Sequence, residues 1–241
     1  MDGYAQNRFS AYFVAAVFFL AFFFLFRGGA LHAGEAGLAS TSPASSCIRY
    51  SDDSGRGIIP YNARLIDGRL LAAGTPFHPQ MPSNTASHVA NIFARIASDG
   101  ITSVVILNVP LKDRQIQQEE ELAAAAGLRT YRIPMNADKV PSASETALIL
   151  RLIENHAYIH CQWGADRTGV VIAKYLRSRC EYSGRTAWEA IIKGGSHAGR
   201  QGGFKIDPKY ARLLEYFWPE VRTEDRDVCR MYSIPFNPPT Q

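Results

Sequence analysis

The chain has 241 residues, 46% of them hydrophobic, and a formal net charge of +4. The basic residues are scattered and form no stripe interleaved with aromatic residues, which argues against nucleic-acid binding. The sequence contains no metal-ligand cluster and no glycine-rich nucleotide motif, so we expect chemistry without a metal or another cofactor.

The first segment is an apolar stretch from Phe9 to Phe26, with Arg8 before it and Arg27 after it. Its length is near the lower limit of about 17 to 25 residues for a membrane span, and exceeds the roughly 7 to 15 apolar residues of a signal peptide. We therefore interpret residues 1–33 as a membrane anchor, with a cleaved signal segment as the alternative. Either reading puts the rest of the chain outside the cytoplasm, anchored on the periplasmic side or secreted after cleavage.

Residues 34–57 are rich in Gly, Ala and Ser and predict a flexible linker. A single α/β domain is expected over residues 58–222, because strand-like and helix-like patterns alternate there. We expect a central, mostly parallel mixed sheet flanked by helices. Residues 223–241 are assigned to a C-terminal tail.

The first half of this domain carries a turn signal and clear periodicities. Asp67-Gly68 lies between two short apolar runs and predicts a hairpin, and Ser142 with Glu145 predicts a capping box at a helix start. The remaining elements are a helix with Val89, Ile92, Phe93 and Ile96 on one face and a stop at Gly100, a strand over 104–107, a helix over 119–126, and a strand over 131–134.

The second half ends with two helices. One begins near Thr186 and stops near Gly194, and the other follows Asp207-Pro208. The glycine-rich segment between them, from Gly194 to Phe204, is either a substrate-facing loop or a surface connection.

The most informative stretch runs from His160 to Gly169 and reads HCQWGADRTG. A β-prone run over 157–160 precedes it, and apolar residues at helical spacing follow it. A tight loop between a strand and a helix turns backbone N–H groups toward a common point, where they bind an anion. Cys161 at the base of this loop is favoured as a thiolate nucleophile.

Other residues of the loop suit phosphate chemistry. Arg167 returns to the mouth of the loop, where its planar guanidinium can hold two phosphate oxygens. Thr168 can donate its hydroxyl to the sulfur, and His160 is expected to orient the loop rather than to transfer a proton. Gly164 and Gly169 permit sharp backbone angles and close helix packing.

This stretch resembles the HCxxGxxR[ST]G signature of the cysteine-dependent phosphatases, in the tyrosine and dual-specificity phosphatase superfamily, and is most similar to its bacterial members. The resemblance implies a protein tyrosine phosphatase-like fold, with Cys161 forming a cysteinyl-phosphate, Arg167 binding phosphate and Thr168 assisting hydrolysis. The other loop residues expected to contact substrate are Gln162, Trp163, Gly164, Ala165 and Asp166.

The family also requires a general acid, an aspartate on an upstream loop. Asp138 is our candidate, because it lies in an Asp-x-x-Pro arrangement that follows a predicted strand, and Asp113 is the alternative. Asp166, inside the phosphate loop, has two open roles: it holds Arg167, or it contacts substrate or water.

Four cysteines are present, at positions 47, 161, 180 and 229. An oxidising compartment favours pairing of two of them. We expect a bridge between Cys47 and Cys229 that ties the two ends of the domain.

The function predicted from these observations is hydrolysis of phosphotyrosine, and also of phosphoserine or phosphothreonine, in proteins. A phosphatase of phospholipid headgroups or inositol phosphates is the first alternative, because the anchor would hold the domain near lipid. A catalytically inactive phosphate-binding module is the second. The expected partners are a phosphorylated protein or phospholipid and the membrane.

Overall fold

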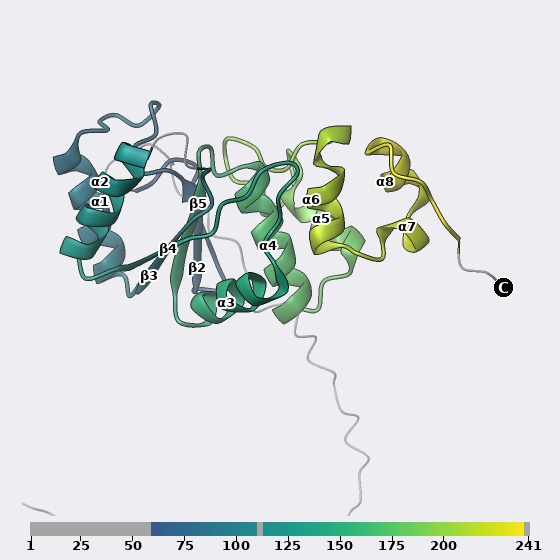
Figure 1. Cartoon of the computed structure of the whole chain (residues 1–241), viewed down its shortest axis with the longest axis horizontal. Coiled ribbons are helices and arrows are strands. Elements are labelled where there is room, and N and C mark those ends of the chain that lie inside the picture. Colours follow the sequence, from purple (N-terminus) through teal and green to yellow (C-terminus); the bar gives the residue numbers. More distant parts are fainter. Residues whose placement is uncertain (1–58, 110–112, 239–241) are drawn as a thin grey trace, which may run out of the picture. The chain divides into compact units, whose positions relative to one another are not determined.

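The computed structural model describes residues 59–109 and 113–238, and a five-stranded sheet lies at its centre (Figure 1). The spatial order of the strands is β1-β2-β5-β3-β4. β1 is antiparallel to β2, and all other neighbours are parallel. The strands are β1 (Arg64–Ile66), β2 (Leu70–Gly74), β3 (Ser103–Ile106), β4 (Arg129–Arg132) and β5 (Ala157–Cys161).

The helices alternate with the strands as predicted. They are α1 (Ala86–Ser98), α2 (Asp113–Ala125), α3 (Ala143–Glu154), α4 (Asp166–Arg179), α5 (Gly184–Ile191), the 3-10 helix η2 (Pro208–Tyr210), α6 (Ala211–Phe217), α7 (Val221–Glu224) and α8 (Arg226–Met231). The mostly parallel mixed sheet with flanking helices is therefore confirmed.

Local sequence signals account for several element boundaries. Asp67 and Gly68 both have positive φ, 53° and 63°, and the N–H of Arg69 donates to the carbonyl of Ile66 at 3.1 Å, which closes a turn within the three-residue loop between β1 and β2. Ser142 and Glu145 form the predicted capping box of α3. Two elements begin earlier than predicted, since α2 starts at Asp113 and β4 at Arg129.

Side chains on the two faces of the sheet enter two different hydrophobic clusters. On β5, Ala157, Ile159 and Cys161 pack with α4 and α5, whereas Tyr158 packs with α1 and α2. This alternation follows from the period of two along a strand. In Figure 1, α1 and α2 lie on one side of the strands and α3 to α6 on the other.

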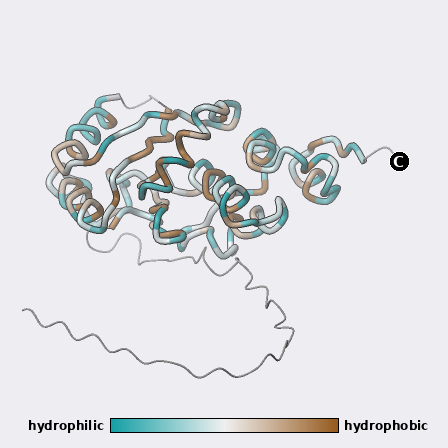
Figure 2. Tube along the Cα trace, turned by 90° about the horizontal axis from the view of Figure 1, so that it is seen from below, coloured by the Kyte–Doolittle hydropathy of each residue, from teal (hydrophilic) through white to brown (hydrophobic). Residues whose placement is uncertain are grey.

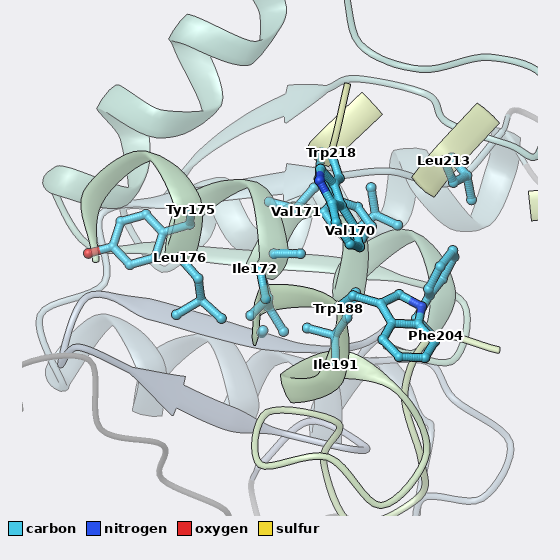
Figure 3. Packing of buried hydrophobic residues seen from close by; sticks show 14 of the residues in the cluster. Val170, Val171, Ile172, Tyr175, Leu176, Trp188, Ile191, Phe204, Leu213 and Trp218 are labelled. Carbon is cyan, nitrogen blue, oxygen red and sulfur yellow. The ribbon is translucent and has the colours of Figure 1, made fainter. Parts of the chain in front are cut away.

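The larger cluster surrounds α4, the helix that follows the loop. Figure 3 shows Val170, Val171 and Ile172 of α4 close to Trp188 of α5 and Trp218 at the end of α6. In Figure 2, hydrophobic stretches run through the middle of the domain, and the outer turns of the helices carry hydrophilic residues. The buried helix fixes the end of β5, and hence the position of Cys161.

The chain after residue 222, assigned to a tail from the sequence, begins as folded structure. α7 and α8 pack on the larger cluster, and Val228, Cys229, Tyr232 and Ile234 are buried. Burial of these side chains gives the segment the apolar contacts that a free tail lacks.

The prediction of a Cys47–Cys229 disulfide is wrong. Cys229 is a free, buried thiol whose S–H donates to the carbonyl of Val221 at 3.3 Å. Cys161 is also free, and Cys180 is disulfide-bonded. Cys47 and the segments over 1–33 and 34–57 lie outside the described residues. Within the described part of the chain, no helix is long and apolar enough to cross a membrane.

Candidate active site

The loop from Cys161 to Ala165 connects the carboxyl end of β5 to the N-terminus of α4. β5 is a central strand, with β2 and β3 as parallel neighbours, so the site lies at the edge where parallel strands end together. Cys161 is only 2% exposed and is paired in register with Gly74 at the end of β2. The nucleophile predicted from the sequence is thus held at the buried base of the loop.

Gly164 allows the loop to turn against β2. Its φ is +65°, and a Cβ built there would lie 2.4 Å from the carbonyl carbon of Ala73 and from the amide nitrogen of Gly74. No side chain fits in that space, so the glycine is required on both counts. Gly169 differs, because a Cβ there would meet Phe204 at ordinary contact distances of 3.6 Å and more.

The backbone amides of the loop are available to an anion. In the described part of the chain, no hydrogen bond uses the N–H groups of residues 163 to 168, and the first helical bond runs from Gly169 N–H to Ala165 O at 2.6 Å. Ala165, at the N-cap position of α4, supplies no side-chain cap. Unpaired amides at a helix start attract negative charge, which fits the predicted phosphate site.

Arg167 reaches from the first turn of α4 toward the carboxyl ends of β3 and β4. Its guanidinium donates to the carbonyl of Leu107 at 3.3 Å and to that of Met135 at 3.5 Å. It is half-buried and lines a cavity of about 220 Å³ together with Thr75, Asn108, Gln115, Glu119 and Gln162. These long contacts orient the fork and leave donors for phosphate oxygens.

Thr168 is fully buried, and its hydroxyl donates to the carbonyl of Ala73 at 3.4 Å. This contact joins α4 to β2 directly behind the loop. Assistance to hydrolysis by Thr168 stays a prediction.

His160 contacts the carboxylate of Glu119, a residue that was not predicted to lie at the site. Its Nε2 lies 2.6 Å from Oε1 of Glu119, and both side chains are buried. The separation is that of a hydrogen bond, although the ring N–H is not aligned with the oxygen, so we treat the pair as a close polar contact. The contact supports the predicted orienting role of His160.

Tyr158 completes this buried polar group. Its ring stacks on that of His160 with centroids 5.0 Å apart, and its hydroxyl donates to the carbonyl of Gly74 at 2.5 Å. Burial, together with the charges of Glu119 and Cys161, raises the pKa of Tyr158 well above 10. The phenol therefore remains a neutral donor that links β5 to β2.

Asp166 makes neither of its hydrogen bonds with Arg167. Its Oδ1 accepts from the backbone N–H of Lys205 at 3.0 Å, and its Oδ2 accepts from the hydroxyl of Tyr210 at 3.3 Å. The carboxylate thus connects the start of α4 to the segment that follows α5. It also lines a second cavity, of about 440 Å³, beside the loop.

The second cavity is bordered by aromatic and basic residues. Trp163 is 49% exposed and packs edge-on against His78, whose ring stacks on Tyr61 with centroids 3.9 Å apart. Lys193 and Lys205 line the same cavity, as do Gln201, Gly202 and Gly203 of the glycine-rich segment. Part of the segment over 194–204 therefore lies beside the phosphate loop, and its contact with substrate stays a prediction.

Among the described residues, the side chain of Asp138 makes no hydrogen bond or ion pair with the loop. Asp138 is exposed, in a turn after β4 where Asn136 Oδ1 accepts from the N–H groups of Asp138 and Lys139 at 2.8 and 2.7 Å. The turn lies close in sequence to Met135, whose carbonyl meets Arg167. Asp113 is the first residue of α2, and its side chain is outside the described atoms.

Sequence reasoning missed Glu119, and also Asn62, whose amide donates to the carbonyls of Trp163 and Gly164. Glu119 had a detectable signal, because it lies at helical spacing with the buried Ile116 and Ala123, where a charged residue requires a partner. Asn62 had no detectable signal in the sequence, because it precedes β1 in an irregular segment. In the described residues, no group of three or more His, Cys, Asp or Glu is arranged to hold a metal ion.

Residues 80–180 match a family model described as "Tc-R-P: Polymorphic toxin system, DSP-PTPase phosphatase". No curated protein matches the chain. Among solved structures, it is similar to Tk-PTP in the active form, with 22% identity over 65% of this chain and 95% of that chain and a TM-score of 0.47.

Two further structures are similar. TpbA of P. aeruginosa is 18% identical over 71% of this chain and 89% of its own, with a TM-score of 0.44. PTPMT1 is 18% identical over 64% of this chain and 92% of its own, with a TM-score of 0.46.

The loop geometry and the matched region together define the class of protein, a cysteine-dependent phosphatase. The region from 80 to 180, which matches the model of the DSP-PTPase phosphatase family, contains the whole stretch from His160 to Gly169. The resemblance inferred from the sequence is confirmed, as is the expected activity of a phosphoric monoester hydrolase.

Proposed function

We propose that the protein hydrolyses phosphotyrosine in proteins in two steps, through a cysteinyl-phosphate on Cys161. The observation that carries the proposal is the position of the Cys161 thiol, at the base of a loop whose amides from 163 to 168 have no partner in the described part of the chain. Those amides stabilise the oxygens of the phosphoryl group, and Arg167 binds two of them.

In the first step the thiolate of Cys161 attacks phosphorus, the P–S bond forms and the bond to the ester oxygen breaks. The leaving oxygen takes a proton from Asp138. In the second step water attacks the phosphorus of the cysteinyl-phosphate, gives its proton to the Asp138 carboxylate, and the P–S bond breaks. The thiolate and inorganic phosphate are the products.

The choice of Asp138 as the acid is supported by strand order. β3, β4 and β5 are parallel neighbours, so the segment after β4 and the loop after β5 emerge at the same edge. The carbonyl of Met135 in that segment already contacts Arg167. A turn held by Asn136 carries Asp138 just beyond this contact.

The choice of phosphotyrosine is supported by Trp163. This side chain is half-exposed at the rim of the phosphate loop and is held edge-on by His78. An exposed indole at that position offers a flat face on which a tyrosyl ring can stack. Phosphoserine and phosphothreonine lack such a ring and gain less from this contact.

A phospholipid headgroup or an inositol phosphate is the second candidate substrate. The observation that favours it is the pair of lysines, Lys193 and Lys205, in the 440 Å³ cavity beside the loop. Two ammonium groups there would attract a second phosphate of the same substrate. An anchor over residues 1–33 would also bring the domain close to lipid.

We further propose that the domain works outside the cytoplasm, held to the membrane by residues 1–33. The apolar stretch from Phe9 to Phe26 supports the anchor. The disulfide at Cys180 supports a location outside the cytoplasm, because disulfides persist in oxidising surroundings. Fractionation of cells into cytoplasm, membrane and periplasm tests the anchor and the location together. Recovery of the protein in the cytoplasmic fraction would contradict both proposals.

A substrate panel tests the proposed function. Wild type and Cys161→Ser are assayed by phosphate release from a phosphotyrosine peptide, the matching phosphoserine peptide, and vesicles containing a phosphoinositide. We expect wild type to prefer the phosphotyrosine peptide and Cys161→Ser to release no phosphate. Preference for the vesicles selects the second candidate, and no activity on any substrate rejects both.

A further inference from the structure

Asn62 is a buried side chain that touches the phosphate loop from a distant part of the sequence. It lies before β1, is fully buried and has a φ of 55°. Its Nδ2 is 3.3 Å from the carbonyl oxygen of Trp163 and 3.2 Å from that of Gly164. One amide group therefore holds two consecutive carbonyls of the loop.

The same side chain also holds the glycine-rich segment. Nδ2 lies 3.2 Å from the carbonyl oxygen of Gly202, and Oδ1 accepts from the N–H of Gln201 at 3.1 Å. An asparagine amide has two N–H donors, so the three carbonyls share them. Asn62 thus joins the phosphate loop to the wall of the neighbouring cavity.

The side chain has little freedom to turn away. A Cβ at Gly199 would lie 2.4 Å from Oδ1 of Asn62, which shows how closely that backbone covers the amide. The backbone carbonyl of Asn62 accepts from Nη1 of Arg64 at 2.7 Å, and Nε of Arg64 donates to the carbonyl of His197 at 3.0 Å. Asn62 is therefore held at its backbone by Arg64 and at its side-chain amide by the phosphate loop.

The hydrogen bonds constrain the direction of the loop amides. In a planar trans peptide the C=O and the next N–H point in opposite directions. Holding the carbonyls of Trp163 and Gly164 toward Asn62 therefore turns the N–H groups of Gly164 and Ala165 away from it. Those two N–H groups belong to the stretch over 163–168 that has no backbone partner in the described part of the chain.

We infer that Asn62 is a positioning residue of the phosphatase site, which orients the N–H groups of Gly164 and Ala165 toward the bound phosphoryl group. The inference rests on the proposed function, because it assigns those amides to the anion. Asn62 itself does not touch the reacting atoms. Without its amide, two loop peptides are free to rotate, and the anion loses donors that are aligned before it binds.

The test uses Asn62→Asp, which keeps the size of the side chain and the acceptor for Gln201 but has no donor for the carbonyls. The matched control is Asn155→Asp, since the exposed Asn155 amide donates to the carbonyl of Arg151 at 2.9 Å, away from the site. Tungstate binding is measured by titration calorimetry, and kcat and KM are measured with para-nitrophenyl phosphate.

For Asn62→Asp we expect the tungstate Kd to rise at least tenfold and kcat/KM to fall at least tenfold, with Asn155→Asp equal to wild type. An Asn62→Asp protein that is folded by circular dichroism and binds tungstate within twofold of wild type overturns the inference. Because calorimetry needs no turnover, this failure is distinct from failure of the proposed function, in which wild type itself hydrolyses no phosphomonoester.

If Asn62→Asp does not fold, Asn62→Gly replaces it, because glycine adopts a φ of 55° without strain and removes the amide. If neither folds, wild type labelled with 15N-asparagine decides. We then expect one slowly exchanging side-chain NH2 pair that shifts when tungstate is added. Rapid exchange of every such pair, or no shift with tungstate, overturns the inference.

Discussion

Nε2 of His160 lies 2.6 Å from Oε1 of Glu119, and this buried contact holds the residue that precedes Cys161, the proposed nucleophile. His160 comes from β5 and Glu119 from α2, so the contact connects the base of the phosphate loop to the helix on the opposite face of the sheet from α4. A buried carboxylate without this partner would be costly.

Replacing Glu119 by Gln removes the charge and keeps the shape. We expect the free energy of unfolding to fall by about 1 to 3 kcal/mol, the range for an impaired buried polar contact, and kcat/KM to fall about tenfold because His160 is less firmly oriented. Urea unfolding and steady-state kinetics measure the two effects. The control is Glu120→Gln, which removes a surface ion pair with Arg132 and should cost less than about 1 kcal/mol. Equal effects of the two substitutions would contradict the role given to Glu119.

Asp138→Asn tests the general acid. Without a proton donor, turnover of substrates with poor leaving groups should fall by about 10² to 10⁴, whereas para-nitrophenyl phosphate, with a good leaving group, should lose much less. The comparison is made with an alkyl phosphate and with para-nitrophenyl phosphate. Asp113→Asn serves as the matched variant. The assignment fails if Asp113→Asn is crippled on the alkyl phosphate and Asp138→Asn is not.

Gly164→Ala and Gly169→Ala separate two glycines of the same motif. At Gly164 the added methyl group collides with the backbone of β2 at 2.4 Å, so we expect activity to fall at least a hundredfold and the melting temperature to drop. Gly169 lies within α4, and a methyl group there would contact Phe204 and Ile191 at ordinary distances of 3.6 Å and more. Alanine there should leave activity within a few-fold of wild type and stabilise the helix by up to about 1 kcal/mol. Kinetics and thermal unfolding of both variants check this contrast, which a severe loss at Gly169 would refute.

His78 predicts a pH dependence of stability. Burial lowers the pKa of His78 from 6.5 to about 4 in the folded protein. Between these values the unfolded chain takes up a proton that the folded chain does not, so stability is greatest above pH 6.5 and is lost as the pH falls toward 4. The shift is worth about 3 kcal/mol at most.

Urea unfolding at pH 7 and pH 4.5 measures this loss for wild type and His78→Phe. Phenylalanine keeps a ring to stack on Tyr61 and cannot be protonated, so the difference between the two pH values should shrink by about 1 to 2 kcal/mol. His156→Asn, at an exposed position with positive φ, is the control and should keep the wild-type difference. An unchanged difference in His78→Phe would show that another group causes the acid destabilisation.

Much of the fold was readable from local patterns. The hairpin at Asp67-Gly68, the capping box at Ser142 and the apolar face of α1 each depend on neighbours within a few residues, and the structure has all three. The loop from His160 to Gly169 was readable for the same reason, since its residues are contiguous in the sequence.

What the sequence did not reveal depends on contacts between distant residues. The bond of Asn62 to the carbonyls of Trp163 and Gly164 joins positions about a hundred residues apart, and Asp166 accepts from Lys205 and Tyr210 rather than holding Arg167. The prediction of a Cys47–Cys229 disulfide was wrong for the same reason, because the pairing of four cysteines is a property of the folded chain.

The central claim, that the sulfur of Cys161 attacks phosphorus, is tested most directly by trapping the intermediate. Wild type and Asp138→Asn are mixed with a 32P-labelled phosphotyrosine peptide, quenched in acid within milliseconds and digested for mass spectrometry. We expect label on the peptide that contains Cys161, and none in Cys161→Ser. Continued release of phosphate with no labelled Cys161 in either active protein would contradict the account.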